Sequence, residues 1–152
     1  MNPMEKISHI VVPVNGSPED EVALSVASAI AKKNKAKITV IYVVEVKRAL
    51  PLDADLPDES AHGQELLDRA DEQAHELDAK IETEMLQART AGVAIVDEAL
   101  TMNADLIVMG LPYRAQFGEF HLGETSNYVL NHATCRVWLV RDKNTPSAEP
   151  DA

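Results

Sequence analysis

The chain has 152 residues and a mass of 16.6 kDa, which is typical of one domain. Its 14 basic and 25 acidic residues leave a net charge of −11, which disfavours binding to nucleic acid and to anionic membranes. The single cysteine excludes an internal disulfide framework, and no apolar stretch is long enough for a signal peptide or a membrane span. The sequence therefore predicts a cytoplasmic globular protein with no nucleic-acid partner and no membrane insertion.

Two β-branched apolar runs predict buried strands near the N-terminus. We expect strands over residues 7–14 and 37–46, because both runs are apolar on both faces. Between them, Ser17 and Pro18 predict the start of a helix over 19–33, with Ser17 as the N-cap and Pro18 at the first helical position.

The middle of the chain predicts a loop, a helix and a third strand. Residues 47–63 are acidic and contain proline, so we expect a partly packed loop, and the apolar spacing of residues 64–80 predicts a helix. Residues 81–88 fit either a continuation of that helix or an edge strand. We favour the strand, because two helical runs would otherwise fuse with no cap between them.

The C-terminal half continues the alternation of helices and strands. The expected elements are a helix over 93–102, a strand over 104–110, a loop over 111–122, a helix over 123–132 and a strand over 135–141. Residues 142–152 are polar and contain proline, and we expect them to be a disordered tail. Residues 1–141 would then form the single α/β domain.

This order of elements predicts the fold class. Strands that are apolar on both faces are typical of a parallel sheet with helices on both sides. We therefore expect an α/β fold with a doubly wound five-stranded parallel sheet in the order 3-2-1-4-5. Ligands of such sheets bind at the carboxyl ends of the strands that flank the switch point, which here are residues 13–16 and 109–112.

The common phosphate-binding and catalytic motifs are absent from the chain. It contains no G-x-x-x-x-G-K-[ST], no G-x-G-x-x-G and no G-x-S-x-G, and its histidines show no metal-ligand spacing. We therefore expect no catalytic residue and no metal site. Gly110 ends the fourth strand, and Gly123 opens a helix whose free N–H groups suit a phosphate. The alternative, that both glycines only serve turns, fits the spacing equally well.

Four segments stand out along the chain as far as Arg141: IVVPVNGS, IYVV, ADLIVMG and GETSNYVLNHATCRVWLVR. Together, in this order, they resemble the universal stress protein family. The resemblance implies the doubly wound five-stranded sheet and a homodimer formed through the last strand. Many members of that family carry the motif G-x2-G-x9-G-[ST] and bind ATP or AMP, whereas others have lost the motif and bind neither.

The resemblance also implies a nucleotide site at particular residues. Gly110 and Gly123 match the first and third glycines of the motif, and Ser126 matches a hydroxyl often found near the phosphates. Pro13 and Val43 match positions that line the adenine and ribose pocket. These five residues are the part of the site that agrees with the family.

Other positions depart from the family pattern. Tyr113 stands where the second glycine is expected, Glu124 replaces the motif serine or threonine, and Asn15 replaces a usual aspartate. Two like charges about 4 Å apart repel by roughly 4 kcal/mol at an effective dielectric of about 20, so Glu124 should weaken ATP binding more than AMP or adenosine binding. We also place Thr125 in the site. Arg114 can reach an anion there, although a surface position is the commoner role for such an arginine.

The functional hypothesis is a regulatory homodimer that binds AMP or ATP weakly between the first and fourth strands and requires no cofactor. The alternative is a nucleotide-free dimeric interaction module that acts on a protein partner such as a transporter. A third hypothesis, a slow ATP hydrolase, has the least support, because the sequence shows no carboxylates placed to bind a metal and no positioned base near the crevice. Val137, Trp138 and Leu139 lie on the last strand and are the predicted dimer interface.

Overall fold

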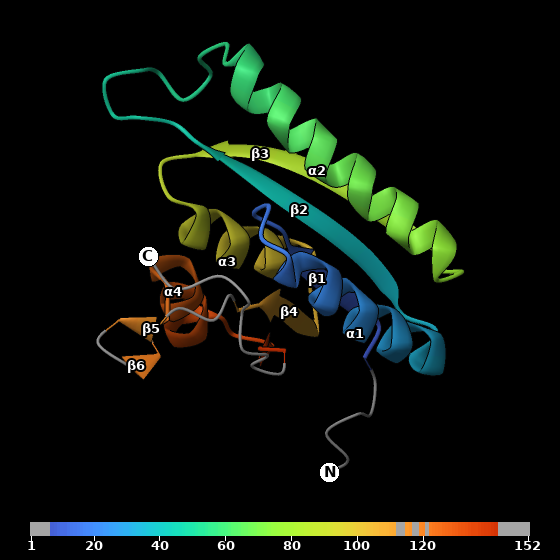
Figure 1. Ribbon diagram of the computed structural model, residues 1–152. Coiled ribbons are helices and arrows are strands. Elements are labelled where there is room, and N and C mark those ends of the chain that lie inside the picture. Colours follow the sequence, from blue (N-terminus) through green and yellow to red (C-terminus); the bar gives the residue numbers. More distant parts are fainter. Residues whose placement is uncertain (1–6, 112–114, 117–118, 121, 143–152) are drawn as a thin grey trace.

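The fold is built on one parallel sheet (Figure 1). The computed structural model describes residues 7–111, 115–116, 119–120 and 122–142. The sheet has five strands in the order β3-β2-β1-β4-β7, which confirms the predicted α/β class and strand order. The strands are β1 His9–Pro13, β2 Lys37–Glu45, β3 Ile81–Ala88, β4 Leu106–Gly110 and β7 Arg136–Val140.

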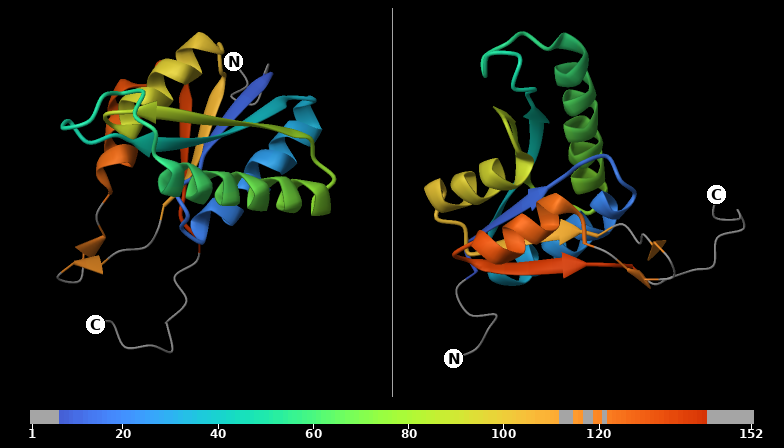
Figure 2. Two further views of the ribbon diagram at one scale, coloured as in Figure 1. Left: turned by 90° about the horizontal axis from the view of Figure 1, so that it is seen from above. Right: turned by 90° about the vertical axis from the view of Figure 1, so that its left-hand side faces the viewer.

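Helices cover both faces of this sheet (Figure 2). They are α1 Glu19–Asn34, α2 Pro57–Glu76, α3 Ala91–Thr101 and α4 Glu124–His132. Ile10 and Val12 of β1 pack into the core under α1 and α2, whereas Val11 packs into the core under α3 and α4. All three side chains are fully buried, as expected for a strand with helices on both sides.

Residues 81–88 form β3, which confirms the strand over the helical alternative. β3 pairs in parallel with β2 along its whole length, from Ile38 opposite Ile81 to Glu45 opposite Ala88. The chain can turn between α2 and β3 because Asp78 adopts a left-handed backbone with a φ of 55°. The helix α2 therefore ends at a turn that the apolar pattern alone did not predict.

The helix α2 begins at Pro57, so the predicted loop over 47–63 is seven residues too long at its C-terminal end. Proline is favoured in the first turn of a helix, where its missing N–H has no partner to lose, and Asp58 and Glu59 complement the helix dipole there. Gly63 lies inside α2, where the ring of Tyr42 packs so closely that an added Cβ would be 2.5 Å from its Cδ2 atom. Both residues fall within the range that was predicted to be a loop.

Two other helix starts also differ from the prediction. Ser17 does not cap α1, since its buried Oγ has no hydrogen-bond partner in the described part of the chain and the N-cap position belongs to Pro18. The helix α3 begins at Ala91 and includes Gly92, where a Cβ would lie 2.9 Å from Cβ of Tyr128. Gly92 therefore permits the close packing of α3 against α4, and it lies inside a helix that was predicted to begin only at residue 93.

The predicted loop over 111–122 contains a small antiparallel hairpin. Its strands are β5 Ala115–Gln116 and β6 Glu119–Phe120. Strands of two residues are too short to produce an alternating apolar pattern, so these two strands could not be predicted. The expected tail lies outside the described residues from position 143 onward. No helix in the described part of the chain is long and apolar enough to cross a membrane.

The connection from β2 to α2 is held by the carboxyl end of β3. Arg89 donates through Nη1 to the carbonyl oxygens of Lys47 and Leu50, each at 2.7 Å. Gln87 donates through Nε2 to the carbonyl oxygen of Leu52 at 2.8 Å. Arg89 therefore organises this connection through main-chain contacts.

Candidate ligand site

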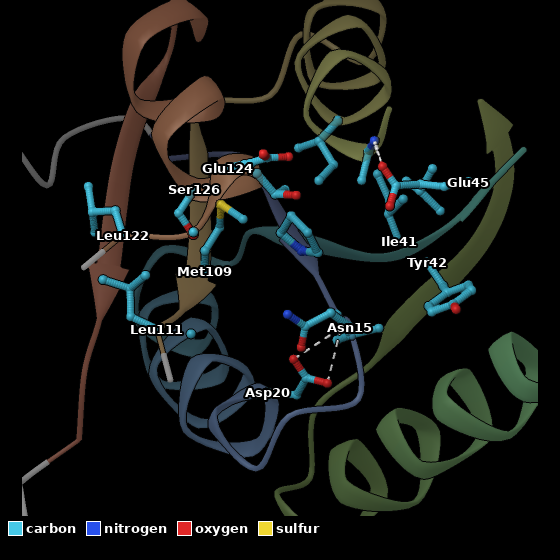
Figure 3. A pocket seen from close by; sticks show the side chains of 18 residues that line it. Asn15, Asp20, Ile41, Tyr42, Glu45, Met109, Leu111, Leu122, Glu124 and Ser126 are labelled. Atoms are coloured by element: carbon cyan, nitrogen blue, oxygen red, sulfur yellow. Dashed lines mark hydrogen bonds between the residues drawn. The ribbon is translucent and has the colours of Figure 1, made fainter. Parts of the chain in front are cut away.

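A cavity of about 620 Å³ lies where the sheet changes its winding direction, at the carboxyl ends of β1 and β4 (Figure 3). Its walls also include the end of β2 and the first turns of α3 and α4. Parallel sheets place the helix N-termini and the strand ends at the same edge, so this is the position expected for a ligand site. The connection over residues 47–56 contributes no residue to the lining.

The structure brings together the predicted site residues that it describes. Those lining the cavity are Pro13, Asn15, Val43, Gly110, Gly123, Glu124, Thr125 and Ser126. Tyr113 and Arg114 lie outside the described residues. Residues that are far apart in the sequence therefore share one cavity.

The two glycines serve different purposes in this cavity. A Cβ at Gly110 would lie 2.3 Å from the carbonyl oxygen of Glu19, so the first turn of α1 occupies the space that a side chain would need. The close approach of α1 is therefore a structural reason for glycine at position 110, beside the expected close approach of a ligand, which stays a prediction. A Cβ at Gly123 would meet no atom of the described residues within 4 Å, so these residues leave the start of α4 uncovered.

The first turn of α4 presents polar groups to the cavity. Gly123 occupies the N-cap position and supplies no side chain to cap the helix, so the N–H groups there remain available. Ser126 is only 7% exposed, and its hydroxyl has no hydrogen-bond partner among the described residues. The Oγ atom itself is not fully buried, so it reaches the open space of the cavity, where a ligand can accept or donate a hydrogen bond.

Three carboxylates line the same cavity, from Asp20, Glu45 and Glu124. The described lining contains no lysine, arginine or histidine. A polyphosphate would therefore meet negative charge without a described compensating cation. Nowhere in the described ranges do three or more His, Cys, Asp or Glu side chains gather in a way that suits a metal ion.

Asp20 is a lining residue that the sequence reasoning missed. Its carboxylate accepts the N–H of Gly16 at 2.8 Å and the N–H of Asn15 at 3.2 Å. Burial raises the pKa of Asp20 to about 6, and the two main-chain hydrogen bonds offset part of that rise. An acidic residue in the first turn of a helix is usually explained by the helix dipole, and the sequence therefore gave no reason to place it in a site.

Glu45 and Tyr42, at the end of β2, were also missed. Glu45 accepts the N–H of Ala91 at 3.0 Å, so its carboxylate caps the start of α3. Burial raises the pKa of Tyr42, and the nearby charges of Glu45 and Glu59 raise it further. The ring of Tyr42 therefore stays neutral and extends the apolar part of the lining.

Comparison with known proteins identifies the family. The model of the universal stress protein family matches residues 6–141. The chain belongs to the universal stress protein family. A universal stress protein of Methanocaldococcus jannaschii is 36% identical over 138 residues, which cover 87% of this chain and 81% of that relative.

Solved structures of other universal stress proteins share the fold. One from Archaeoglobus fulgidus in complex with dAMP has a TM-score of 0.70 at 22% identity, over 87% of this chain and 96% of the other. Another, in complex with cAMP, has a TM-score of 0.69 at 20% identity, over 89% of this chain and 97% of the other. At these identities the likeness establishes the fold of the present universal stress protein.

Proposed function

We propose that this universal stress protein binds an adenine nucleotide in the cavity between β1 and β4, and that it binds AMP more tightly than ATP. The observation that carries the proposal is the uncovered first turn of α4, where Gly123 leaves space and the Ser126 hydroxyl has no partner. A helix N-terminus attracts anions through its free N–H groups and its partial positive charge. The complexes of related proteins with dAMP and cAMP support an adenine compound as the ligand.

The lining has a distinct place for each part of such a ligand. Pro13 and Val43 offer an apolar surface to the adenine ring, and α4 offers its N-terminus to a phosphate. Glu124 is exposed on that same turn, so water and salt screen its repulsion without removing it. AMP, with one phosphate, should meet less repulsion than ATP. We propose a binding role for this cavity, with no catalytic step assigned to its lining residues.

A thermal-shift comparison of ATP, AMP and adenosine tests the proposed ligand. A ligand at 100 times its Kd stabilises the folded state by about 2.7 kcal/mol, which raises the Tm by about 5–10 °C in a domain of this size. At equal concentrations we expect adenosine and AMP to raise the Tm more than ATP does. No shift with any of the three compounds would refute the nucleotide site, and a larger shift with ATP than with AMP would refute the role of the carboxylates.

We further propose a homodimer that forms through β7. β7 is one edge of the sheet, and its Val137, Trp138 and Leu139 are only half-buried. β3 is the other edge and carries Glu82 and Glu84, whose charges disfavour pairing with a second copy. The contrast between the two edges favours β7 as the interface.

Trp138→Asp should convert the dimer to a monomer, because it places a charge in a desolvated apolar interface. Light scattering should then give half the mass of the unchanged protein, with far-ultraviolet circular dichroism confirming the fold. Thr83→Asp, on the exposed face of the opposite edge, is the matched control and should leave the mass unchanged. A dimeric Trp138→Asp protein, or a monomeric unchanged protein, would contradict this interface.

A second candidate function is an interaction module that works without nucleotide. The three carboxylates of the cavity favour it, because the described lining offers no basic side chain to an anion. The protein would then act through its dimer surface on a protein partner. Ultraviolet absorbance released from the purified protein on denaturation distinguishes the two functions, since only the first predicts bound nucleotide.

A further inference from the structure

Residues 15–17 form one wall of the ligand cavity and have open space on both sides. In front of them lies the cavity of about 620 Å³, whose lining includes Asn15. Behind them lies a second cavity of about 270 Å³, which Gly16 and Ser17 line together with residues of α1 and α2. A Cβ added to Gly16 would lie 3.5 Å from Cδ1 of Leu66, so α2 leaves ordinary contact space beside the loop. The segment is therefore a thin partition between two cavities.

The two ends of this segment are fixed by main-chain hydrogen bonds. The strand β2 accepts the N–H of Val14 at 2.9 Å, and the carbonyl oxygen of Ser17 accepts the N–H of Asp20 at 3.0 Å. In the middle, the N–H of Gly16 donates to Oδ2 of Asp20 at 2.8 Å. The N–H of Asn15 is shared between both oxygens of that carboxylate, at 3.2 Å each (Figure 3). Within the described part of the chain, the Asp20 carboxylate thus ties the middle of the segment to the rest of the fold.

The strength of these contacts depends on the charge of Asp20. A hydrogen bond to an ionised carboxylate is roughly twice as strong as one between neutral groups. Gly16 has a φ of 95°, and a glycine can leave this left-handed backbone without steric cost. We propose that ionised Asp20 is a positioning residue that holds residues 15–17 against the ligand cavity, and that its protonation releases them toward the second cavity and weakens ligand binding. The effect on binding rests on the proposed function, whereas the release itself needs no ligand.

The surroundings of Asp20 place this protonation close to neutral pH. Burial raises the pKa of Asp20 from 3.8 to about 6, although its two main-chain hydrogen bonds lower it. The charges of Glu19 and Glu21, in the same helix turn, raise the pKa further. Asp20 is therefore mostly ionised at about pH 7.5 and mostly protonated at about pH 5.

Titratable and charged groups face Asp20 from three other elements. Those that line the two cavities with it are Tyr42 and Glu45 of β2, Glu124 of α4 and Arg69 of α2. His62 of α2 also lies close to the loop, because its Nε2 is 3.9 Å from the position of a Cβ at Gly16. Histidine is the residue type among these that usually changes charge between about pH 5 and 8. His62 is therefore the competing source of a pH response and has to be replaced separately.

The same protonation acts on global stability in the opposite direction. Because burial raises the pKa of Asp20, the folded state binds this proton more tightly than the unfolded chain does. The contribution of Asp20 to the free energy of unfolding is therefore full below pH 3.8 and is lost as the pH rises through about 6. A looser loop at about pH 5 is consequently not explained by the effect of Asp20 on the fold as a whole.

Amide NMR of the ligand-free protein tests the release of the segment. The Gly16 and Asn15 amide signals should shift with a midpoint near pH 6, and their ¹⁵N–¹H NOE values should change from rigid at about pH 7.5 to mobile at about pH 5. Asp20→Asn imitates the neutral acid, so its loop should be mobile at both pH values. His62→Gln and Glu21→Gln, which remove neighbouring titratable groups on α2 and α1, should keep the transition.

Calorimetry with adenosine tests the effect on binding. Adenosine carries no phosphate, so its own charge does not change over this range. In the unchanged protein we expect its Kd to be about 3- to 10-fold higher at about pH 5 than at about pH 7.5, because the stronger bonds to ionised Asp20 are lost. In Asp20→Asn the Kd should be raised at both pH values and should differ by less than about 2-fold between them. Circular dichroism confirms that each variant keeps the fold.

The outcomes separate this inference from the function on which part of it rests. If the Gly16 and Asn15 amides stay rigid at about pH 5, or if Asp20→Asn keeps the transition, the release is overturned. If His62→Gln abolishes the transition, His62 controls the loop and the inference fails. If the loop is released but adenosine binds equally at both pH values, the positioning role is overturned and the adenine site stands. If adenosine binds at neither pH, the proposed function is overturned, and the positioning role with it.

Discussion

Gly110→Ala should destabilise the protein by about 3 kcal/mol, at the upper end of the usual cost of overpacking a core. The added Cβ would lie 2.3 Å from the carbonyl oxygen and 2.6 Å from the carbonyl carbon of Glu19. Both are main-chain atoms, so the clash can be relieved only by moving the first turn of α1 away from β4. Urea unfolding measures the loss as a lower transition midpoint at an unchanged slope.

Gly123→Ala is the matched control for this substitution. The Cβ added at Gly123 meets no described residue within 4 Å, so the expected cost is the poorer N-cap propensity of alanine, about 1 kcal/mol or less. A Gly110→Ala protein as stable as Gly123→Ala would mean that α1 and β4 do not pack as described.

Glu124→Ser should raise the affinity for AMP by about 10-fold and for ATP by about 100-fold. The substitution removes a negative charge from the first turn of α4, where a phosphate would lie, and adds a hydroxyl that can donate to it. Adenosine carries no phosphate, so its affinity should hardly change. Calorimetry at low and high salt should show the gain shrinking as salt increases, because Glu124 is exposed to screening.

Asp58→Ser is the control for Glu124→Ser. It also removes a carboxylate from the first turn of a helix, α2, but Asp58 is not part of the cavity lining. Its nucleotide affinities should equal those of the unchanged protein. An equal gain in both variants would show that total charge matters more than position, and no gain in Glu124→Ser would remove Glu124 from the site.

The fold was predictable because its strands carry a strong signal. The runs in β1, β2 and β4 are apolar on both faces, and only a sheet covered on both sides buries such strands. The wrong predictions of element boundaries involve residue types that occur both in loops and in helices. Pro57 and Gly63 were read as loop residues, yet proline also starts helices and glycine also permits close packing against a ring such as that of Tyr42.

The candidate site was predictable only in part. The resemblance to the family placed Gly110, Gly123 and Ser126, and the structure puts all three on one cavity. Asp20 and Glu45 carried no comparable signal, because their contacts to main-chain N–H groups depend on how separate segments meet in space. The packing of α1 against Gly110 was also not predictable, since it leaves no trace in the local sequence.

The path of the β2–α2 connection is fixed by hydrogen bonds from Arg89 and Gln87 to its main chain. Arg89 and Gln87 hold main-chain oxygens, while the side chains of Leu50 and Leu52 remain 39% and 50% exposed. The path of the segment is therefore largely independent of its side-chain identities. Such a segment can diverge between species, or accept a grafted peptide epitope, while the scaffold beneath it stays the same.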